Sequence, residues 1–145
     1  MRGIKNIRLL HYDDRSDGWY FITIVTRHRQ PYFEGREKEV NEIIAETTAV
    51  IVGVSIDTLV VMPNHLHCIL VLHNSVLALG EIVRRIKAKT SHQLGFPVWQ
   101  PNYFEHVIRN EESLGRIRAY IFLNPEAEIY KKLRHRGAGP SLLDS

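Results

Sequence analysis

The sequence predicts an α+β sandwich, in which helices pack on a single antiparallel sheet of ferredoxin-like type. Two segments carry the one-sided apolar stripe of an amphipathic helix, and each lies between strand-like runs. Two of those runs are separated only by a Pro-Asn pair, which is typical of a hairpin turn. The resulting order is strand, helix, strand, strand, helix, strand, helix. This order suits one antiparallel sheet covered by helices.

The first predicted strand and helix are clearly marked in the sequence. Residues 19–26 are β-branched and aromatic and follow the turn signal Ser16-Asp17-Gly18, so we expect a strand there. From Glu37 to Val52, apolar side chains recur on one face while glutamates occupy the other. This spacing predicts an amphipathic helix, and Gly53 is positioned to end it.

The middle of the chain reads as a hairpin. Residues 55–62 and 65–72 are two apolar runs joined by Pro63-Asn64. Proline followed by asparagine favours a tight turn, because proline fixes its own φ and asparagine tolerates turn conformations. We therefore expect two antiparallel strands connected directly at this pair.

The second half supplies another helix, an extended segment and a last helix. An apolar stripe begins at Leu79 and ends near Gly95, and residues 98–109 read as extended. Asn110 can cap a third helix, whose first turn carries two glutamates where the helix dipole favours negative charge. Pro125 is expected to end or kink this helix.

Composition narrows the class of protein. The 145 residues suit one domain, which we place at 1–130, followed by a basic, flexible tail at 131–145. A single cysteine, Cys68, excludes an intrachain disulfide and a multi-cysteine zinc site. The net charge of +3 permits a nucleic-acid partner without requiring one. We see neither a membrane span nor a secretory signal, so we expect a cytoplasmic protein without a membrane partner.

Two histidines form a candidate metal site. His65 and His67 alternate on the predicted strand, so both imidazoles project from one face, at the strand's start where they can reach solvent. A divalent ion bound by this pair needs at least one further ligand. The residues alone also fit two polar side chains on a half-exposed strand, which is the commoner meaning of such a pair.

A tyrosine on the last helix is a candidate nucleophile. Tyr120 and Asn124 are four residues apart and share a helix face. A phenol has a pKa near 10 and is a poor nucleophile by itself. It can attack when a metal activates the electrophile, for instance by polarising a phosphodiester. Asn124 could supply the third metal ligand. The pattern equally fits Tyr120 as a packing residue, and it does not favour Tyr120 over Tyr103 or Tyr130.

Basic and aromatic side chains suggest contact with nucleic acid. Cations that could bind phosphates, and aromatic rings that could stack on unpaired bases, gather in a few segments. The candidates are Arg27, Arg84, Arg85, Lys87, Lys89, Trp99 and Tyr103. A solvated cationic helix face is as good an explanation for any one cluster.

Several motifs together resemble a known family. The runs at 60–67 (VVMPNHLH), 98–112 (VWQPNYFEHVIRNEE) and 116–125 (RIRAYIFLNP) look like the single-tyrosine HUH transposases. The REP-associated tyrosine transposases, relatives of the transposases of small insertion sequences, are the branch it is most similar to. The segment 19–29 is similar to the family's first strand, and the likeness spans residues 18–126 in the family's order.

The resemblance implies specific roles. His65 and His67 match the motif that binds a catalytic divalent metal ion, Mg²⁺ or Mn²⁺, and Asn124 matches a position that can complete its ligands. Tyr120 matches the nucleophile that forms a 5′-phosphotyrosine link to single-stranded DNA. The fold would be the HUH endonuclease form of the ferredoxin-like sandwich. The DNA partner would be single-stranded DNA with palindromic, hairpin-forming sequences.

We therefore expect a metal-dependent transposase that cleaves and rejoins single-stranded DNA beside hairpins. The main alternative is a domesticated palindrome-binding protein without productive transposition. A small metal-binding protein that acts on a small molecule is a weaker alternative, because the basic clusters and the tyrosine helix disfavour it. The family includes both monomers and dimers, so the sequence leaves open whether the protein is a homodimer.

Overall fold

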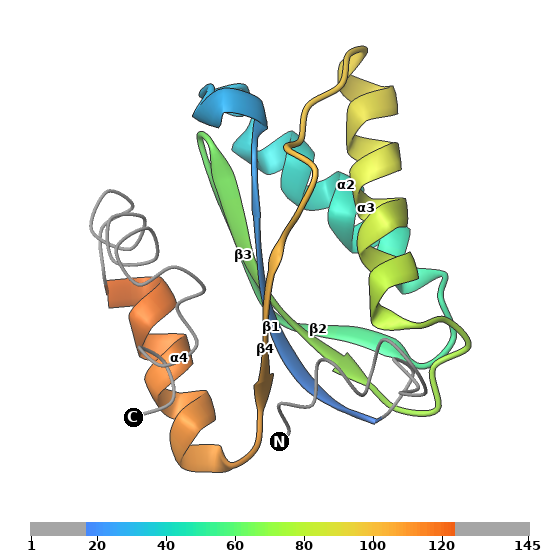
Figure 1. Ribbon diagram of the computed structural model, residues 1–145, viewed down its shortest axis with the longest axis vertical. Coiled ribbons are helices and arrows are strands. Elements are labelled where there is room, and N and C mark those ends of the chain that lie inside the picture. Colours follow the sequence, from blue (N-terminus) through green and yellow to red (C-terminus); the bar gives the residue numbers. More distant parts are fainter. Residues whose placement is uncertain (1–16, 124–145) are drawn as a thin grey trace.

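Four antiparallel strands form one sheet, and helices pack against both of its faces (Figure 1). The computed structural model describes residues 17–123. The elements are β1 (Gly18–Val25), a short 3-10 helix η1 (Arg27–Arg29), α2 (Glu37–Ala49), β2 (Val54–Met62), β3 (His65–Leu72), α3 (Leu79–Leu94), β4 (Phe104–Ile108) and α4 (Glu111–Leu123).

The strand order in the sheet is β2-β3-β1-β4, and every neighbouring pair is antiparallel. Helices α2 and α3 lie together on one face, and α4 lies on the other (Figure 1). The predicted α+β sandwich with an antiparallel sheet is therefore confirmed. The hairpin of β2 and β3 turns at Pro63-Asn64, as the sequence predicted.

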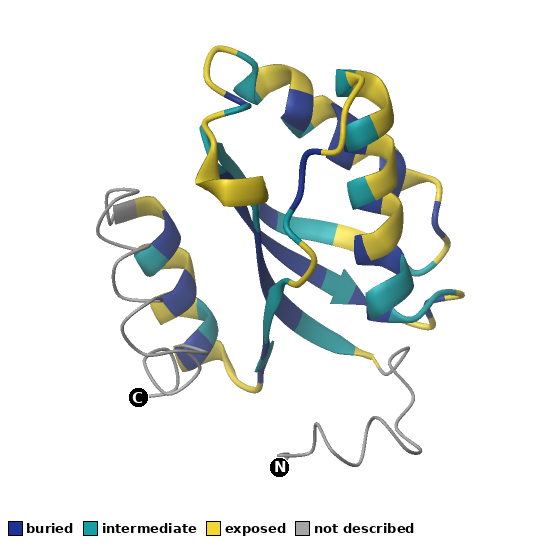
Figure 2. Cartoon of the chain, turned by 45° about the horizontal axis from the view of Figure 1, so that its top comes forward, coloured by how far each residue is buried: buried dark blue, intermediate teal, exposed yellow. Residues whose placement is uncertain are grey.

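The two faces of the sheet carry separate apolar clusters. The larger one, here called the α2/α3 cluster, includes Tyr20, Ile22 and Ile24 from β1 together with the apolar stripes of α2 and α3. The smaller one, the α4 cluster, consists of Phe21, Ile69, Ile108, Ile117 and Ile121. Figure 2 shows buried residues along the strands and on the sheet-facing sides of the helices. Side chains of β1 and β3 alternate between the two clusters because successive residues of a strand face opposite sides.

Two predicted helix boundaries are confirmed, and a third is wrong. The Asn110 side chain caps α4 by accepting a hydrogen bond from the Ser113 amide at 2.8 Å, and left-handed Gly95 ends α3. The first helix, however, ends at Ala49 rather than Val52. Its last turn tightens there, because the Ile51 amide bonds the Thr48 carbonyl, only three residues back.

The extended segment predicted at 98–109 is only partly a strand. Regular pairing begins at Phe104, and Trp99 forms only an isolated bridge to Thr26, the residue after β1. Pro125 and the proposed tail at 131–145 lie outside the described residues. Between residues 17 and 123, no helix is long and apolar enough to cross a membrane.

Gly53 has a role other than the predicted helix stop. It starts the connection into β2 with φ +90°, and a Cβ there would lie 2.5 Å from the Ser75 Cα and 2.6 Å from the Asn74 carbonyl oxygen. Both neighbours are backbone atoms of the loop between β3 and α3, so they cannot rotate away. Only glycine lets these two backbone segments approach so closely.

We predict that Gly53→Ala lowers the free energy of unfolding by roughly 2–4 kcal/mol, because it adds a backbone clash to left-handed strain. Gly35→Ala is the matched control: Gly35 has φ +79° but nothing within 4 Å of its added Cβ. We expect that control to cost about 1 kcal/mol. Urea unfolding measures both values, and equal losses would contradict the close approach at residue 53.

Candidate metal and nucleophile site

His65 and His67 lie at the start of β3, next to the hairpin turn, and face the α4 side of the sheet. Their ring centroids are 4.8 Å apart, with the planes at 76°. The expectation that they reach solvent is wrong, since both residues are 0% exposed. On this face of the sheet the Phe21 ring centroid is 5.6 Å from that of His67.

The Nδ1 atom of each histidine has a side-chain partner. His65 Nδ1 lies 2.7 Å from Asn64 Oδ1, and His67 Nδ1 lies 2.9 Å from Thr23 Oγ1. An amide oxygen only accepts, so His65 Nδ1 donates and the lone pair of the neutral ring is on Nε2. Thr23 can accept from His67 in the same way, because a hydroxyl both donates and accepts. Both rings would then present Nε2 as the metal-binding atom.

His67 Nε2 is buried and has no hydrogen-bond partner among the described residues. A buried polar atom without a partner is costly, so such an atom in a folded protein calls for an explanation. A metal ion bound at this nitrogen would provide one. The donor set of the pair therefore fits two ligand positions of a divalent cation.

Burial also sets the charge of the pair. Loss of water lowers the pKa of His65 to about 4. Burial, and then repulsion from His65, lowers the pKa of His67 to about 3. Both imidazoles are therefore neutral near pH 7, which is the form that binds a cation without first releasing a proton.

The described residues supply only part of a metal site. Residues 17–123 contain no group of three or more His, Cys, Asp or Glu side chains that could hold a metal ion. The predicted third ligand, Asn124, lies outside the described residues. A complete coordination sphere would therefore need oxygen atoms beyond the histidine pair.

Tyr120 lies on the same side of the sheet as the histidines. It is half-buried and packs against the α4 cluster, to which Ile117 and Ile121 of the same helix also belong. The other tyrosines that the structure describes all pack in the α2/α3 cluster, on the opposite face; they are Tyr20, Tyr32 and Tyr103. The fold thus separates Tyr120 from Tyr103, which the sequence pattern could not do. Tyr130 lies outside the described residues.

The basic residues of α3 lie on the opposite side of the sheet from Tyr120 (Figure 1). Arg84 and Arg85 both bond the Glu81 carboxylate, at 2.5 and 3.3 Å, and hydrogen bonding by these arginines lowers the pKa of Glu81 to about 2. Together with Lys89 they line a groove between α2 and α3. Arg27 is exposed in η1. These four residues stay predicted DNA contacts.

Lys87 has a structural contact that the sequence did not reveal. Its ammonium lies 3.0, 2.9 and 3.4 Å from the backbone carbonyl oxygens of residues 100, 101 and 102. These bonds attach the segment before β4 to α3. A phosphate would have to compete with the three carbonyls for this cation.

The prediction that Trp99 stacks on DNA bases is wrong. Trp99 is only 8% exposed and packs in the α2/α3 cluster, with its ring centroid 5.2 Å from that of Phe33. An aromatic ring in an extended segment looks the same in sequence whether it faces solvent or the core. Tyr103 is half-buried, and its hydroxyl lies 3.3 Å from Glu105 Oε1.

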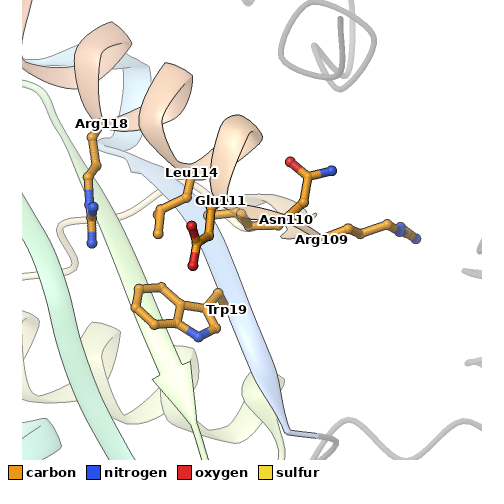
Figure 3. A pocket seen from close by; sticks show the side chains of 7 residues that line it. Trp19, Arg109, Asn110, Glu111, Leu114 and Arg118 are labelled. Atoms are coloured by element: carbon orange, nitrogen blue, oxygen red, sulfur yellow. The ribbon is translucent and has the colours of Figure 1, made fainter.

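Sequence reasoning also missed an ion pair beside the site. Arg118 of α4 bonds both carboxylate oxygens of Asp57 in β2, at 2.6 and 3.0 Å, and lies 6.0 Å from the Trp19 ring centroid. Arg118 and Trp19 also line a cavity of about 570 Å³ at the start of α4 (Figure 3). The two residues are 61 positions apart in the sequence, so no local sequence pattern predicts the contact.

The chain is similar in sequence to several known proteins. Residues 14–124 match the family described as "Transposase IS200 like". A Haemophilus influenzae protein of unassigned function is 32% identical over 157 aligned positions, covering 83% of this chain and 87% of that protein. The REP-associated tyrosine transposase of Escherichia coli K12 is 37% identical over 71 residues, covering 48% of this chain and 43% of the relative.

A solved structure shares the fold. The REP-associated tyrosine transposase determined bound to a REP hairpin superposes with a TM-score of 0.61 and 26% sequence identity. The match covers 84% of this chain and 70% of that one. The sequence resemblance to the tyrosine transposases is therefore confirmed, and the chain belongs to the IS200-like transposase family.

Proposed function

We propose that this protein is a metal-dependent transposase that cleaves and rejoins single-stranded DNA beside hairpins through a 5′-phosphotyrosine link. One observation carries the proposal: Tyr120 is the single tyrosine among residues 17–123 that packs on the sheet face of His65 and His67. The relative solved with a REP hairpin supports hairpin DNA as the substrate. A homodimer stays a prediction from the sequence.

The histidine pair would hold the cation. His65 and His67 would bind Mg²⁺ or Mn²⁺ through Nε2, with Asn124 as the proposed third ligand. When bound, such a cation polarises the scissile phosphate and stabilises the charge that develops on it. Thr23 and Asn64 would keep the rings oriented by accepting from Nδ1.

Tyr120 would act as the nucleophile. Its oxygen forms a bond to the phosphorus while the bond to the 3′ oxygen of the preceding nucleotide breaks. The phenol loses one proton and the departing 3′ hydroxyl gains one, so protons balance. One phosphodiester replaces another, which makes the step nearly isoenergetic. The reverse reaction with a different 3′ hydroxyl would rejoin strands without a nucleotide cofactor.

We predict that Tyr120→Phe abolishes the covalent protein–DNA adduct formed with hairpin-bearing single-stranded DNA and Mn²⁺, because it removes the attacking oxygen. Denaturing gel electrophoresis detects the adduct, and a binding titration should give a hairpin Kd within about twofold of wild type, since phosphate contacts from cationic side chains dominate the affinity of such an interface. Tyr32→Phe, in the α2/α3 cluster, makes the same change on the other face and should keep the adduct.

Two results would count against this assignment. An adduct that persists in Tyr120→Phe would mean that another group attacks. Binding of hairpin DNA without any adduct from the wild-type protein would favour the domesticated palindrome-binding alternative. An intact adduct in wild type and Tyr32→Phe, lost in Tyr120→Phe alone, is the result that we expect.

We predict that Thr23→Val weakens Mn²⁺ binding roughly 10- to 100-fold, because His67 loses the group that orients its ring. His67→Ala should weaken it further. Electron paramagnetic resonance titration of free Mn²⁺ measures the affinity without DNA. Thr90→Val is the matched control, since Thr90 is also buried but bonds the Ile86 carbonyl within α3. Equal affinities in the two threonine variants would contradict the proposed orientation of His67.

A further inference from the structure

A β-bulge in β2 turns an acidic side chain toward α4. Ile56 pairs with Leu70 and Thr58 pairs with the next residue, Ile69, so Asp57 is an extra residue in the strand. Ile56 faces the α2/α3 cluster, and Thr58 is opposite Ile69, which belongs to the α4 cluster. Such a bulge places two successive side chains on one face. Asp57 and Thr58 therefore both point to the α4 side of the sheet.

The bulge brings Asp57 to Arg118. Both guanidinium bonds to the carboxylate are short, 2.6 and 3.0 Å, and the Thr58 hydroxyl donates to the same carboxylate at 2.6 Å. The Asp57 side chain is only 15% exposed. Hydrogen bonding by Arg118 lowers the pKa of Asp57, so the pair is charged near neutral pH. A two-bond contact of this kind fixes orientation as well as distance.

Helix α4 otherwise has a narrow attachment to the sheet. It makes few close backbone approaches to the rest of the described chain. Its fully buried apolar side chains are Ile117 and Ile121, which lie one turn apart along a single line. Leu114 and Tyr120 pack against the same cluster from either side of this line, but only as partly buried side chains. The apolar packing therefore resists sliding more firmly than it resists a roll of the helix about its own axis. A directional two-bond contact to one side of the line limits that roll further.

Arg118 and Tyr120 lie on opposite sides of this line. At about 100° per residue, Arg118 is roughly 80° to one side of the Ile117–Ile121 line and Tyr120 is roughly 80° to the other. A roll that lifts Arg118 from the sheet therefore swings Tyr120 toward it, and the reverse roll swings Tyr120 away. The position of Tyr120 relative to the histidines is thus coupled to the Asp57–Arg118 contact.

We propose that Asp57 and Arg118 are positioning residues, which fix the roll of α4 and so place the Tyr120 oxygen for attack. This inference rests on the proposed function of Tyr120. The pair touches neither the phosphate nor the metal in this role. It sets how often the tyrosine occupies the reactive position, and a misplacement of about 1 Å can reduce a rate roughly a hundredfold.

The test compares wild type, Asp57→Asn, Arg118→Met and the double exchange of Asp57→Arg with Arg118→Asp. The rate of adduct formation is measured in a single turnover with saturating hairpin DNA and Mn²⁺, and the hairpin Kd is measured separately. The proteins also carry 3-fluorotyrosine, and the ¹⁹F resonance of Tyr120 is identified by its loss in Tyr120→Phe. That resonance reports the environment of the ring without DNA or metal.

Each single variant should slow adduct formation roughly 10- to 100-fold, leave the hairpin Kd within about twofold, and shift the Tyr120 resonance. The double exchange should recover most of the rate, because it restores an oppositely charged pair. Glu39→Gln is the matched control: it breaks another two-bond arginine pair, with Arg36 at the start of α2, and should change none of the three readouts.

The outcomes separate this inference from the proposed function. If wild type forms no adduct, the proposed function fails. The ¹⁹F resonance of Tyr120 in Asp57→Asn then decides by itself whether the pair positions Tyr120, because this readout needs neither DNA nor metal. An unchanged rate and resonance in both single variants would overturn the inference. A loss of rate that follows an equal loss of hairpin affinity would also overturn it, because the pair would then act in DNA binding.

Discussion

The alternation of side chains along β3 determines where the chemistry of this protein can lie. β3 is an inner strand, paired on both sides, and nearly every one of its residues is buried. Even-numbered residues such as Cys68 face α2 and α3, whereas His65 and His67 face α4. A slip of one residue in its pairing would exchange the two sets and bury the imidazoles in the larger apolar cluster. The turn at Pro63-Asn64 on one side and the pairing with β1 on the other exclude that slip.

The fold tolerates two buried imidazoles on that face because polar side chains lie within hydrogen-bond distance of both Nδ1 atoms. The pairing of β1 with β3 sets Thr23 directly opposite His67, and the hairpin turn sets Asn64 beside His65. Burial lowers the pKa of both rings and keeps them neutral near pH 7. The same burial that is costly for the fold would favour the proposed metal binding, because a neutral imidazole is the form that binds a cation. Under the proposed function, strand register is a functional constraint as well as a structural one.

The two layers of helices carry different groups of candidate residues. Helices α2 and α3 form a broad apolar layer on one face, and the cations of α3 line the groove on its outer side. Helix α4 carries Tyr120 on the other face and is attached through the α4 cluster, in which Ile117 and Ile121 are its fully buried side chains, and through the ion pair with Asp57. A single strand of DNA that contacts both the α3 groove and Tyr120 would have to pass around an edge of the sheet. The bulge at Asp57 belongs to the edge strand β2, where an extra residue is tolerated without disturbing the inner pairs.

The sequence by itself determined the order of elements, the hairpin, the capping of α4 by Asn110 and the shared face of the two histidines. These depend on local periodicity and turn chemistry, which neighbouring residues encode. Only the tertiary structure decided the rest. Trp99 proved to be core, Lys87 proved to hold backbone carbonyls, and Tyr120 rather than Tyr103 proved to share the face of the histidines. Asp57 and Arg118 meet only because a bulge and a distant helix bring them together. Contacts between residues far apart in the chain decide which face a side chain occupies and what covers it. Local sequence patterns do not encode those contacts.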